Sequence, residues 1–340
     1  TGAGSGVGQS IVKALNISNL NLNIFSADVN YLNAGLYRST RSVIVPKVES
    51  KGAIKWYLSN LKKLNIHVLF VGSEYDLLFF SRYSEKIWKE TKCKVCVSNR
   101  QTVEMANDKY LTQNFLQKNN LPFLKTFLPK SLPEAIKFTK KLSYPFILKG
   151  RKGTSSRNVH LIKNLDLLKK LYKTVKDPIM QEHIGSKKND ISTEYTCSFF
   201  KSKEKNVLGP FLIKRKILHG TSWIAEVTNN LKISKLILKI AKITDCVGSF
   251  NIQLRLTKKG PIPFEFNPRF SGTTSIRSYF GFNEPEMYIK NYVFNKKIIK
   301  KQFKIKNGVC LRYIEEIFLD KSNLKSLPKK IGKGKILKWF

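Results

Sequence analysis

The chain has 340 residues and a mass of 39.1 kDa, with 42% hydrophobic and 25% charged residues. This composition is typical of a folded globular protein and excludes the disordered and collagen-like classes. The length predicts two or three domains. No apolar run approaches the roughly 20 residues that a membrane-spanning helix needs, which excludes that class too.

The formal net charge is +39, from 62 basic and 23 acidic residues. Such a charge would suit a nucleic-acid-binding protein, because the release of counterions from phosphates drives association. Lysine, however, is spread through every segment and is not gathered with arginine and aromatic residues. We interpret the charge as a composition bias that gives only non-specific affinity for nucleic acid. A basic nucleic-acid-binding protein stays an alternative.

The five cysteines are too few and too scattered for a disulfide scaffold. Cys93 and Cys96 form a C-x-x-C pair, but no second pair of cysteine or histidine stands at the spacing of zinc ligands. We therefore predict buried thiols and a cytoplasmic protein, because that compartment keeps thiols reduced.

Residues 1–107 alternate short apolar runs with helical patterns. Strands are predicted at Leu22–Ala27, Val43–Val45, Val68–Val71 and Val95–Val97, and helices at Val7–Leu15, Ala53–Leu64 and Leu77–Trp88. Strand and helix in turn predict a parallel sheet covered on both faces. The chain starts inside a glycine-rich turn, so we expect the first strand of this unit to precede Thr1.

The next part of the chain mixes both element types and then becomes rich in strands. Asn107 and Asp108 are predicted to cap a helix over Lys109–Lys118. Further predicted elements are a helix at Pro133–Leu142, a helix at Lys232–Thr244, and strands at Phe146–Lys149, Val159–Ile162, Ile179–His183, Tyr195–Phe200, Val207–Ile217, Ser249–Leu256 and Pro263–Phe266. The basic tail from Lys321 to Phe340 is assigned no structure.

The start, Thr1–Gly8, is the first candidate site. Glycines before a helix let the backbone turn sharply and present amide groups to an anion. The pattern T-G-x-x-x-G-x-G resembles short-chain dehydrogenases, whose Tyr-x-x-x-Lys has counterparts at Tyr172–Lys176 and Tyr292–Lys296. Chance alone supplies such spacings in so lysine-rich a chain. An NAD(P)-dependent oxidoreductase therefore stays an alternative, beside a purely structural turn.

The stretch Gly248–Thr274 carries the clearest chemistry. Glu265 and Asn267 stand two residues apart, so they lie on the same face of their predicted strand, and Gln253 lies on the strand before it. One carboxylate and two amide oxygens suit a hard cation such as Mg²⁺. Arg269 follows as a charge that could meet a phosphoryl group. An incidental polar surface hairpin is the competing interpretation.

Two upstream segments contribute phosphate-binding candidates. Lys149 ends an apolar strand and leads into Gly150–Arg157, whose small residues could close over phosphates with their N–H and hydroxyl groups. Lys109, at a helix start, offers a second ammonium. Glu182 lies in the hinge-like end of a strand, and Glu194 opens the next strand, where it could accept hydrogen bonds from ribose hydroxyls.

The order of these pieces resembles the ATP-grasp ligases, and within them the branch that contains the carbamoyl phosphate synthetase large subunit and related amino-acid ligases. The resemblance spans roughly residues 1–315. It implies an α/β protein with a Rossmann-like preceding domain at 1–107, followed by a two-lobed α+β ATP-grasp fold. Its small lobe is expected at 108–185, its large lobe at 186–320, and a basic tail at 321–340.

The resemblance also implies roles for individual residues. Lys109 and Lys149 would bind the phosphates of ATP, and the mobile loop over them would contain Gly153, Thr154, Ser155 and Ser156. Glu182 and Ile184 would lie by the adenine and Glu194 on the ribose. His219 sits near a nucleotide-site histidine of the synthetase branch, although an ordinary half-exposed strand histidine explains it equally well. Gln253, Glu265 and Asn267 match the metal-binding positions, for Mg²⁺ or Mn²⁺. Arg269 matches the arginine near the transferred phosphate and, with Lys149, is a predicted catalytic residue.

The implied activity is an ATP- and Mg²⁺-dependent ligase that joins a small-molecule carboxylate to an amine, or less readily to a thiol, through an acyl phosphate. Dimers are common among similar ligases, so a homodimer is the expected assembly, with no membrane partner. Glu74 and Asp76 are candidates to line the acyl-substrate region, beside an ordinary surface role. A degenerate ATP-grasp protein that binds ATP without catalysis is a further alternative.

Overall fold

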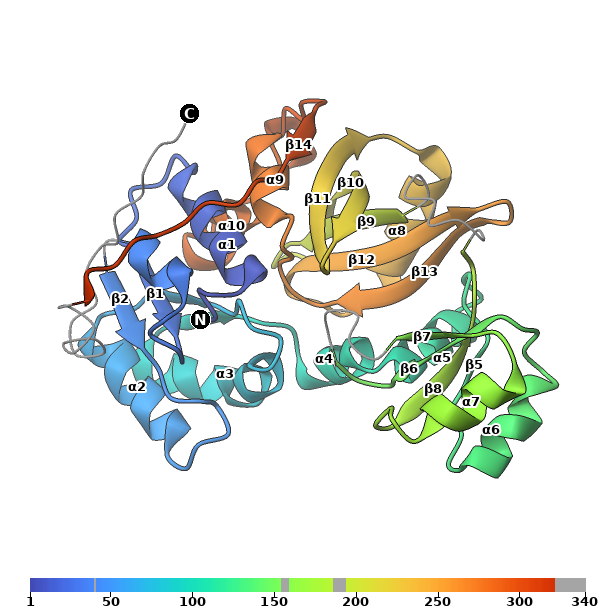
Figure 1. Cartoon of the computed structure of the whole chain (residues 1–340). Coiled ribbons are helices and arrows are strands. Elements are labelled where there is room, and N and C mark those ends of the chain that lie inside the picture. The colour runs from blue at the N-terminus through green and yellow to red at the C-terminus, as the bar shows by residue number, and fades with distance from the viewer. Residues whose placement is uncertain (40, 154–158, 186–193, 322–340) are drawn as a thin grey trace.

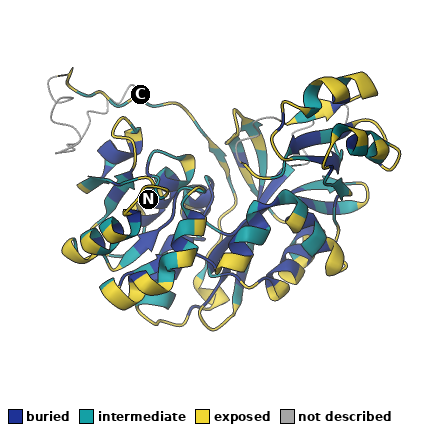
Figure 2. Ribbon diagram, turned by 90° about the horizontal axis from the view of Figure 1, so that it is seen from below, coloured by how far each residue is buried: buried dark blue, intermediate teal, exposed yellow. Residues whose placement is uncertain are grey.

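The computed structural model describes residues 1–39, 41–153, 159–185 and 194–321. Its elements gather in three groups (Figure 1): an N-terminal α/β region, a small sheet with helices, and a larger sheet whose chain returns to the N-terminal region. Each group has a buried centre and an exposed outer surface (Figure 2). In the described part of the chain, no helix is long and apolar enough to cross a membrane.

The N-terminal region contains two pairs of parallel strands. β1 (Phe25–Asp28) pairs with β2 (Arg41–Ile44), and β3 (Val68–Phe70) pairs with β4 (Lys94–Cys96). The helices are α1 (Gly6–Asn16), α2 (Ala53–Lys63), α3 (Leu77–Thr91) and the 3-10 helix η1 (Ala34–Arg38). The predicted alternation of strand and helix is confirmed. The predicted single sheet is not seen, because the described strands form two separate pairs.

The small sheet is antiparallel, in the order β5-β8-β6-β7. Its strands are β5 (Thr126–Phe127), β6 (Phe146–Gly150), β7 (His160–Ile162) and β8 (Pro178–Glu182). The helices of this part are α4 (Arg100–Asn107), α5 (Lys109–Lys118), α6 (Leu132–Thr139) and α7 (Leu165–Tyr172). The side chain of Asp108 caps α5, as predicted. Phe146 and Leu148 are fully buried in the core between the sheet and its helices.

The large sheet is antiparallel and has the order β13-β12-β9-β10-β11-β14. Its strands are β9 (Glu194–Lys201), β10 (Val207–Leu218), β11 (Thr221–Thr228), β12 (Gly248–Thr257), β13 (Gly260–Asn267) and β14 (Val309–Leu311). Helix α8 (Leu231–Ile243) packs on one face through Ile233, Ile237 and Ile240. The predicted strands 195–200, 207–217 and 249–256 are confirmed within a residue or two.

A second core joins the large sheet to the N-terminal region. It includes residues of α9 (Thr274–Tyr279), α10 (Glu284–Tyr288) and the π-helix η3 (Ile289–Val293). The exposed 3-10 helix η4 (Lys300–Gln302) follows them. The ring of Phe70 on β3 contacts Phe270 and Tyr288 at centroid distances of 5.5 and 5.7 Å. The chain then runs back across the N-terminal region (Figure 1), where Glu315 pairs with Arg38 at 2.6 Å.

Candidate active site

Lys149, the predicted phosphate ligand on β6, is buried in the small sheet. Its Nζ donates a hydrogen bond of 2.6 Å to Oε1 of Gln181 on the adjacent β8. Gln181 is itself fixed, since its Nε2 donates to Oγ1 of Thr126 at 2.9 Å. Burial and the charge of Lys109 lower the pKa of Lys149 to about 8, while Glu265 opposes that shift. The charges of Lys109 and Glu265 therefore both act on the pKa of Lys149, in opposite directions.

Lys109 starts α5 and holds the loop that follows β6. Its Nζ donates to the carbonyl oxygen of Gly153 at 2.7 Å, and its backbone N–H donates to that of Arg151 at 3.1 Å. Nε of Arg151 pairs at 2.6 Å with the buried carboxylate of Asp108. The start of the loop is thus anchored at the helix N-terminus. Three further predicted loop residues, Thr154, Ser155 and Ser156, lie outside the described residues.

Glu182 and Ile184, the predicted adenine neighbours, lie where β8 ends. The N–H of Glu182 donates to the carbonyl oxygen of Lys125 at 2.9 Å, and its Oε2 accepts from the N–H of Lys125 at 3.2 Å. Ile184 follows, half-buried, after the chain has left the sheet. Glu182 therefore closes the end of the small sheet, and its contact with a base stays a prediction.

An ion-pair network crosses the large sheet where β9 begins. Nη2 of Arg215 on β10 donates to Oε1 of Glu194 at 2.9 Å and to Oε1 of Gln253 at 2.8 Å. Arg255 contacts the other oxygen of Glu194 at 3.3 Å. Both oxygens of the predicted ribose ligand therefore have arginine partners. Nε of Arg215 is buried and has no partner among the described residues.

Sequence reasoning missed Arg215. It stands between Lys214 and Lys216 in a chain with 62 basic residues, so no signal sets it apart. The structure distinguishes Arg215 from its neighbours, because its side chain is only 9% exposed. It joins Glu194, the predicted ribose ligand, to Gln253, a predicted metal ligand.

The three predicted metal ligands lie together, which confirms their expected proximity. Gln253 on β12 stands directly opposite Glu265 on β13 in the antiparallel register. Oε1 of Glu265 accepts hydrogen bonds from Nε2 of Gln253 at 3.2 Å and from Nδ2 of Asn267 at 3.1 Å. Two amides therefore converge on one carboxylate.

Arg269 follows β13 and reaches the N-terminal region. Its Nη2 donates to Oε2 of Glu74 at 2.7 Å, and its Nη1 donates to the carbonyl oxygen of Phe270 at 2.8 Å. Glu74 lies in the turn between β3 and α3. Nε of Arg269 is buried without a partner among the described residues. The guanidinium thus retains an unused donor at Nε.

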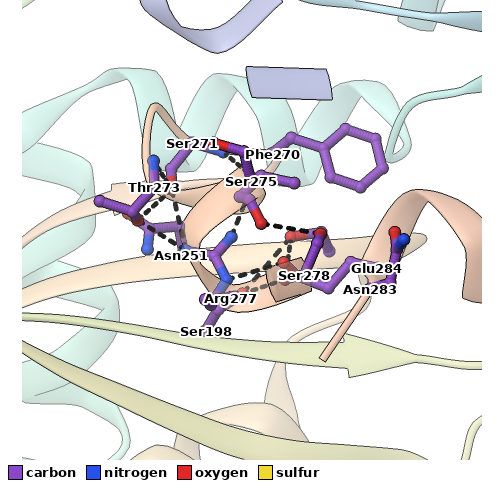
Figure 3. Close-up of polar contacts among 12 residues, drawn as sticks. Ser198, Asn251, Phe270, Ser271, Thr273, Ser275, Arg277, Ser278, Asn283 and Glu284 are labelled. Atoms are coloured by element: carbon purple, nitrogen blue, oxygen red, sulfur yellow. Dashed lines mark hydrogen bonds and ion pairs between the residues drawn. The ribbon is translucent and has the colours of Figure 1, made fainter. Parts of the chain in front are cut away.

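A buried cluster supports the loop after Arg269 (Figure 3). Arg277 and Glu284 form a fully buried ion pair at 2.7 Å. Arg277 also donates to the hydroxyls of Ser271 at 3.0 Å and Thr273 at 2.7 Å, both in that loop. Oε1 of Glu284 accepts from Ser249 at 2.7 Å, at the start of β12. The cluster therefore fixes the loop to the sheet, a role that sequence reasoning missed.

His219 lies at the exposed tip of the hairpin formed by β10 and β11. It has φ of 48° and is followed by Gly220 with φ of 73°, which is the pattern of a two-residue turn between β10 and β11. The turn alone accounts for this residue. The predicted half-exposed strand position is wrong, and the contact of His219 with a nucleotide stays a prediction.

In the glycine-rich segment Thr1–Gly8, other groups of the protein bond or pack against the backbone. The Gly4 N–H donates to Oδ2 of Asp28 at 2.8 Å, while Oδ1 of Asp28 accepts from Nδ2 of Asn33 at 2.6 Å. A Cβ on Gly8 would lie 2.1 Å from the carbonyl oxygen of Gly2. The glycines therefore serve close backbone packing, which does not support the oxidoreductase alternative.

The cysteines behave as predicted. Cys93 and Cys96 are buried free thiols, and burial raises the pKa of Cys93 to about 12. Within the described ranges, histidine, cysteine, aspartate and glutamate form no group of three or more that could hold a metal ion. A candidate cation site must therefore draw on amide oxygens.

Comparison with known proteins identifies the same part of the chain. A family model for ATP-grasp proteins in the biosynthetic pathway with Ter operon matches residues 192–317. The chain is 23% identical over 199 residues to the alpha-aminoadipate–LysW ligase LysX of Saccharolobus solfataricus. That match covers 54% of this chain and 70% of the relative.

Solved structures extend the likeness to nearly the whole chain. The N5-carboxyaminoimidazole ribonucleotide synthetase of Thermus thermophilus superposes with a TM-score of 0.73 at 13% identity, covering 98% of this chain and 90% of that one. The biotin carboxylase domain of the Hydrogenobacter thermophilus 2-oxoglutarate carboxylase, in complex with MgADP and bicarbonate, has a TM-score of 0.69 at 11% identity. It covers 89% and 71% of the two chains. The chain thus has the mixed α/β ATP-grasp fold, and its residues 192–317 match an ATP-grasp family model.

Proposed function

We propose that this protein is an ATP- and Mg²⁺-dependent ligase that activates a small carboxylate as an acyl phosphate and joins it to an amine. The observation that carries the proposal is that the amides of Gln253 and Asn267 converge on Glu265, whose charge acts on the pKa of the buried Lys149 together with that of Lys109. We assign these two lysines to the phosphates of ATP, opposite the candidate cation ligands on β12 and β13. LysX is by name a ligase for alpha-aminoadipate, which supports an amino-acid-like carboxylate as substrate.

The donor set around Glu265 fits Mg²⁺ or Mn²⁺. The oxygen and nitrogen of a side-chain amide differ by a rotation, so Asn267 can present Oδ1 where Nδ2 now lies. Gln253 can do the same once its Oε1 leaves Arg215. Glu265, Asn267 and Gln253 would then hold the ion through hard oxygen ligands. When bound, the ion would neutralise charge on the phosphates of ATP.

The chain's own cations supply the remaining electrostatic work. A substrate carboxylate and a triphosphate repel one another, so the site must hold both in line and offset their charges. We assign Lys109 and Lys149 to the phosphates, and the free Nε of Arg269 to the transferred phosphoryl group.

The reaction would proceed in two displacements. A carboxylate oxygen attacks the γ-phosphorus, the bond to the β–γ bridging oxygen breaks, and ADP leaves. The amine nitrogen then attacks the acyl carbon, the carbon–oxygen bond to phosphate breaks, and the nitrogen loses a proton. Neither step needs a covalent bond to the protein, so no serine or cysteine is assigned as a nucleophile.

The nucleoside end would lie between the lobes. We assign the segment at Glu182 and Ile184 to the adenine and Glu194 to the ribose. In that role Glu194 would exchange one arginine partner for ribose hydroxyls, and Arg215 would stay between the nucleoside and the cation ligands.

Residues 1–107 would form the Rossmann-like preceding domain and help to bind the acyl substrate. The support is the parallel pairing of its strands and the contact of Arg269 with Glu74 at their carboxyl edge. Residues 108–185 and 186–320 would be the two lobes. The free thiols support a cytoplasmic location, and a homodimer is the proposed assembly.

The test is a screen for ADP and phosphate release with Mg²⁺, ATP and panels of amino acids and small carboxylates, each with and without an amine acceptor. We expect release that needs both ATP and one carboxylate class, and a product with a new carbon–nitrogen bond by mass spectrometry. ATP binding with no release for any panel member would favour a degenerate ATP-grasp protein. Turnover that depends on nicotinamide would overturn the proposal.

A further inference from the structure

Arg215 on β10 contacts one residue from each of two ligand groups assigned under the proposed function. Its Nη2 donates to Oε1 of Glu194 at 2.9 Å and to Oε1 of Gln253 at 2.8 Å. Its Nη1 donates to the hydroxyl of Ser222 at 3.3 Å. One nitrogen of a buried guanidinium therefore links the proposed ribose ligand to a proposed cation ligand.

The neighbours of Gln253 decide which way its side-chain amide points. A guanidinium can only donate hydrogen bonds, and an ionised carboxylate can only accept them. The oxygen of Gln253 therefore faces Arg215, and its nitrogen faces Oε1 of Glu265 at 3.2 Å. Turning the amide over would set donor against donor and acceptor against acceptor. Arg215 and Glu265 thus hold Gln253 in a single orientation.

This orientation is the wrong one for a cation held at Glu265. Mg²⁺ and Mn²⁺ take oxygen ligands, but Gln253 presents its N–H donors to that carboxylate. The oxygen of Gln253 is bonded to Arg215, whose positive charge also repels a divalent ion. Gln253 can therefore become a cation ligand only after its oxygen leaves Arg215.

Arg215 leaves one of its own donors unsatisfied while it holds Gln253. Its Nε is buried and has no hydrogen-bond partner within the described ranges. A buried donor without a partner is costly, and the ion pair with Glu194 offsets that cost. A ligand that donates hydrogen bonds to Glu194 would weaken this ion pair. It would thereby free the guanidinium to move away from Gln253.

We propose that Arg215 is a positioning residue that keeps Gln253 out of the cation site until a nucleoside occupies Glu194. In the nucleotide-free protein, Arg215 turns the oxygen of Gln253 away from Glu265. Ribose hydroxyls at Glu194 would release the guanidinium and let that oxygen turn toward Glu265. The inference rests on the proposed function, because it uses the ribose and cation assignments made there. It adds an order of binding, in which the nucleoside precedes the cation at Gln253.

The main experiment measures how tightly the nucleotide-free, full-length protein binds Mn²⁺, from the electron paramagnetic resonance signal of the free ion. Arg215→Met should bind Mn²⁺ about tenfold more tightly than the parent chain, which is a typical coupling between two sites. Equal affinities of Arg215→Met and the parent would overturn the proposal. If Arg215→Met does not fold, Arg215→Gln, which is shorter and uncharged, takes its place.

Arg255→Met is the matched control. Arg255 contacts the other oxygen of Glu194 at 3.3 Å, so this substitution removes a charge beside the same carboxylate but leaves the bond between Arg215 and Gln253. Because the Arg255 side chain is partly exposed and its charge is screened by salt, the Mn²⁺ affinity should change by about twofold or less. An equal gain in Arg255→Met and Arg215→Met would show that only charge matters, which would overturn the proposal.

A second substitution tests whether the gain passes through Gln253. Gln253→Met keeps the length of the side chain and removes its oxygen. Combined with Arg215→Met, it should abolish the gain in Mn²⁺ affinity, because contacting residues that act together are not additive. A gain that persists in the double variant would overturn the proposal.

Adenosine tests the nucleoside, since it carries ribose hydroxyls and no phosphate that could bind Mn²⁺ itself. It should raise the Mn²⁺ affinity of the parent about fivefold and leave that of Arg215→Met unchanged. Adenosine that binds without changing the Mn²⁺ affinity of the parent would overturn this inference alone. If neither ADP nor adenosine binds, or if Glu265→Gln leaves Mn²⁺ binding in the presence of ADP unchanged, the proposed function fails as well.

Discussion

Two stretches of this chain, Thr1–Gly8 and Gly248–Thr274, look alike as sequence, because each places glycine and polar residues beside a regular element. The structure separates them. At the start of the chain, Asp28 and the backbone satisfy the turn's own polar groups, and the glycines permit close packing. In the hairpin, two amides converge on Glu265 and Arg269 keeps a buried donor without a partner in the described part of the chain.

The difference shows what separates packing from chemistry in a motif. A stretch whose polar atoms are all used by the fold has little left with which to bind a ligand. A stretch that gathers side-chain amides around one carboxylate, and that leaves a buried arginine donor without a partner among the described residues, keeps polar groups with which to bind a ligand. Substitutions in the two stretches should therefore fail in different ways.

The largest effect is expected from Glu265→Gln, which removes the only carboxylate of the proposed cation site while keeping its shape. ADP formation should fall by about 10³-fold, as when a group that stabilises transition-state charge is lost. Glu226→Gln, an exposed position on β11, is the matched control and should keep normal turnover. Turnover of Glu265→Gln within tenfold of the parent would remove Glu265 from the site.

Asp28→Asn should act on stability and not on chemistry. The Asp28 side chain accepts hydrogen bonds from Gly4, Asn30 and Asn33, so its loss should lower the free energy of unfolding by about 2 kcal/mol. Urea unfolding measures this, with the exposed Asp166→Asn as the control. ADP formation per folded molecule should change less than threefold. A specific loss of turnover would mean that the turn takes part in the reaction.

The pH dependence tests Lys149 and its neighbour Gln181. The pKa of Lys149 is lowered to about 8 from 10.5, so its ammonium is present below pH 8 and is lost as pH rises through that value. Turnover should fall over the same pH range, which would form the alkaline limb of the pH–activity profile. Gln181→Glu adds a negative charge at the acceptor and should move the limb up by about one pH unit, whereas Gln181→Met should move it down.

A merely structural role for Gln181 would lower activity without moving the limb. The sign for stability is opposite to that for turnover. Between pH 8 and 10.5 the unfolded chain holds the Lys149 proton more often than the folded chain does, so this residue makes the protein more stable as pH rises across that window.

The smallest effect is expected from His219→Asn. Asparagine tolerates the positive φ of this exposed turn, so both stability and the KM for ATP should stay within twofold of the parent. Steady-state kinetics at varied ATP decides the matter. A tenfold rise in KM with unchanged unfolding would return His219 to the nucleotide site.

Local signals explain which elements could be predicted. Asp108 precedes a helical pattern and accepts from its first amides, so the start of α5 is readable from the sequence. The hairpin of β12 and β13 is readable from its apolar alternation and the turn at Lys258–Gly260, and the pairing of Gln253 with Glu265 follows from it. The start of β1 could not be predicted, because the apolar run 22–27 includes Asn23 and gives no sign that only Phe25–Asp28 pairs with a neighbouring strand.

The missed features depend on contacts between distant segments. The pair of Arg277 and Glu284 forms only when α9 and α10 fold onto β12, and a charge pattern does not reveal it. Arg215 is hidden by its basic neighbours, and β11 and β14 were missed because their exposed, mixed patterns resemble loops. The lysine-rich composition therefore makes individual functional charges harder to predict than helices and strands.

The contact between Arg269 and Glu74 has a consequence for protein engineering. It links the loop beside the proposed site of phosphoryl transfer to a turn in the N-terminal region. A chimaera that borrows its first hundred residues from another enzyme, in order to change what is ligated, would need an acidic residue at that turn. Without one, the graft would leave a buried cation without its counter-charge, whatever new substrate the graft could hold.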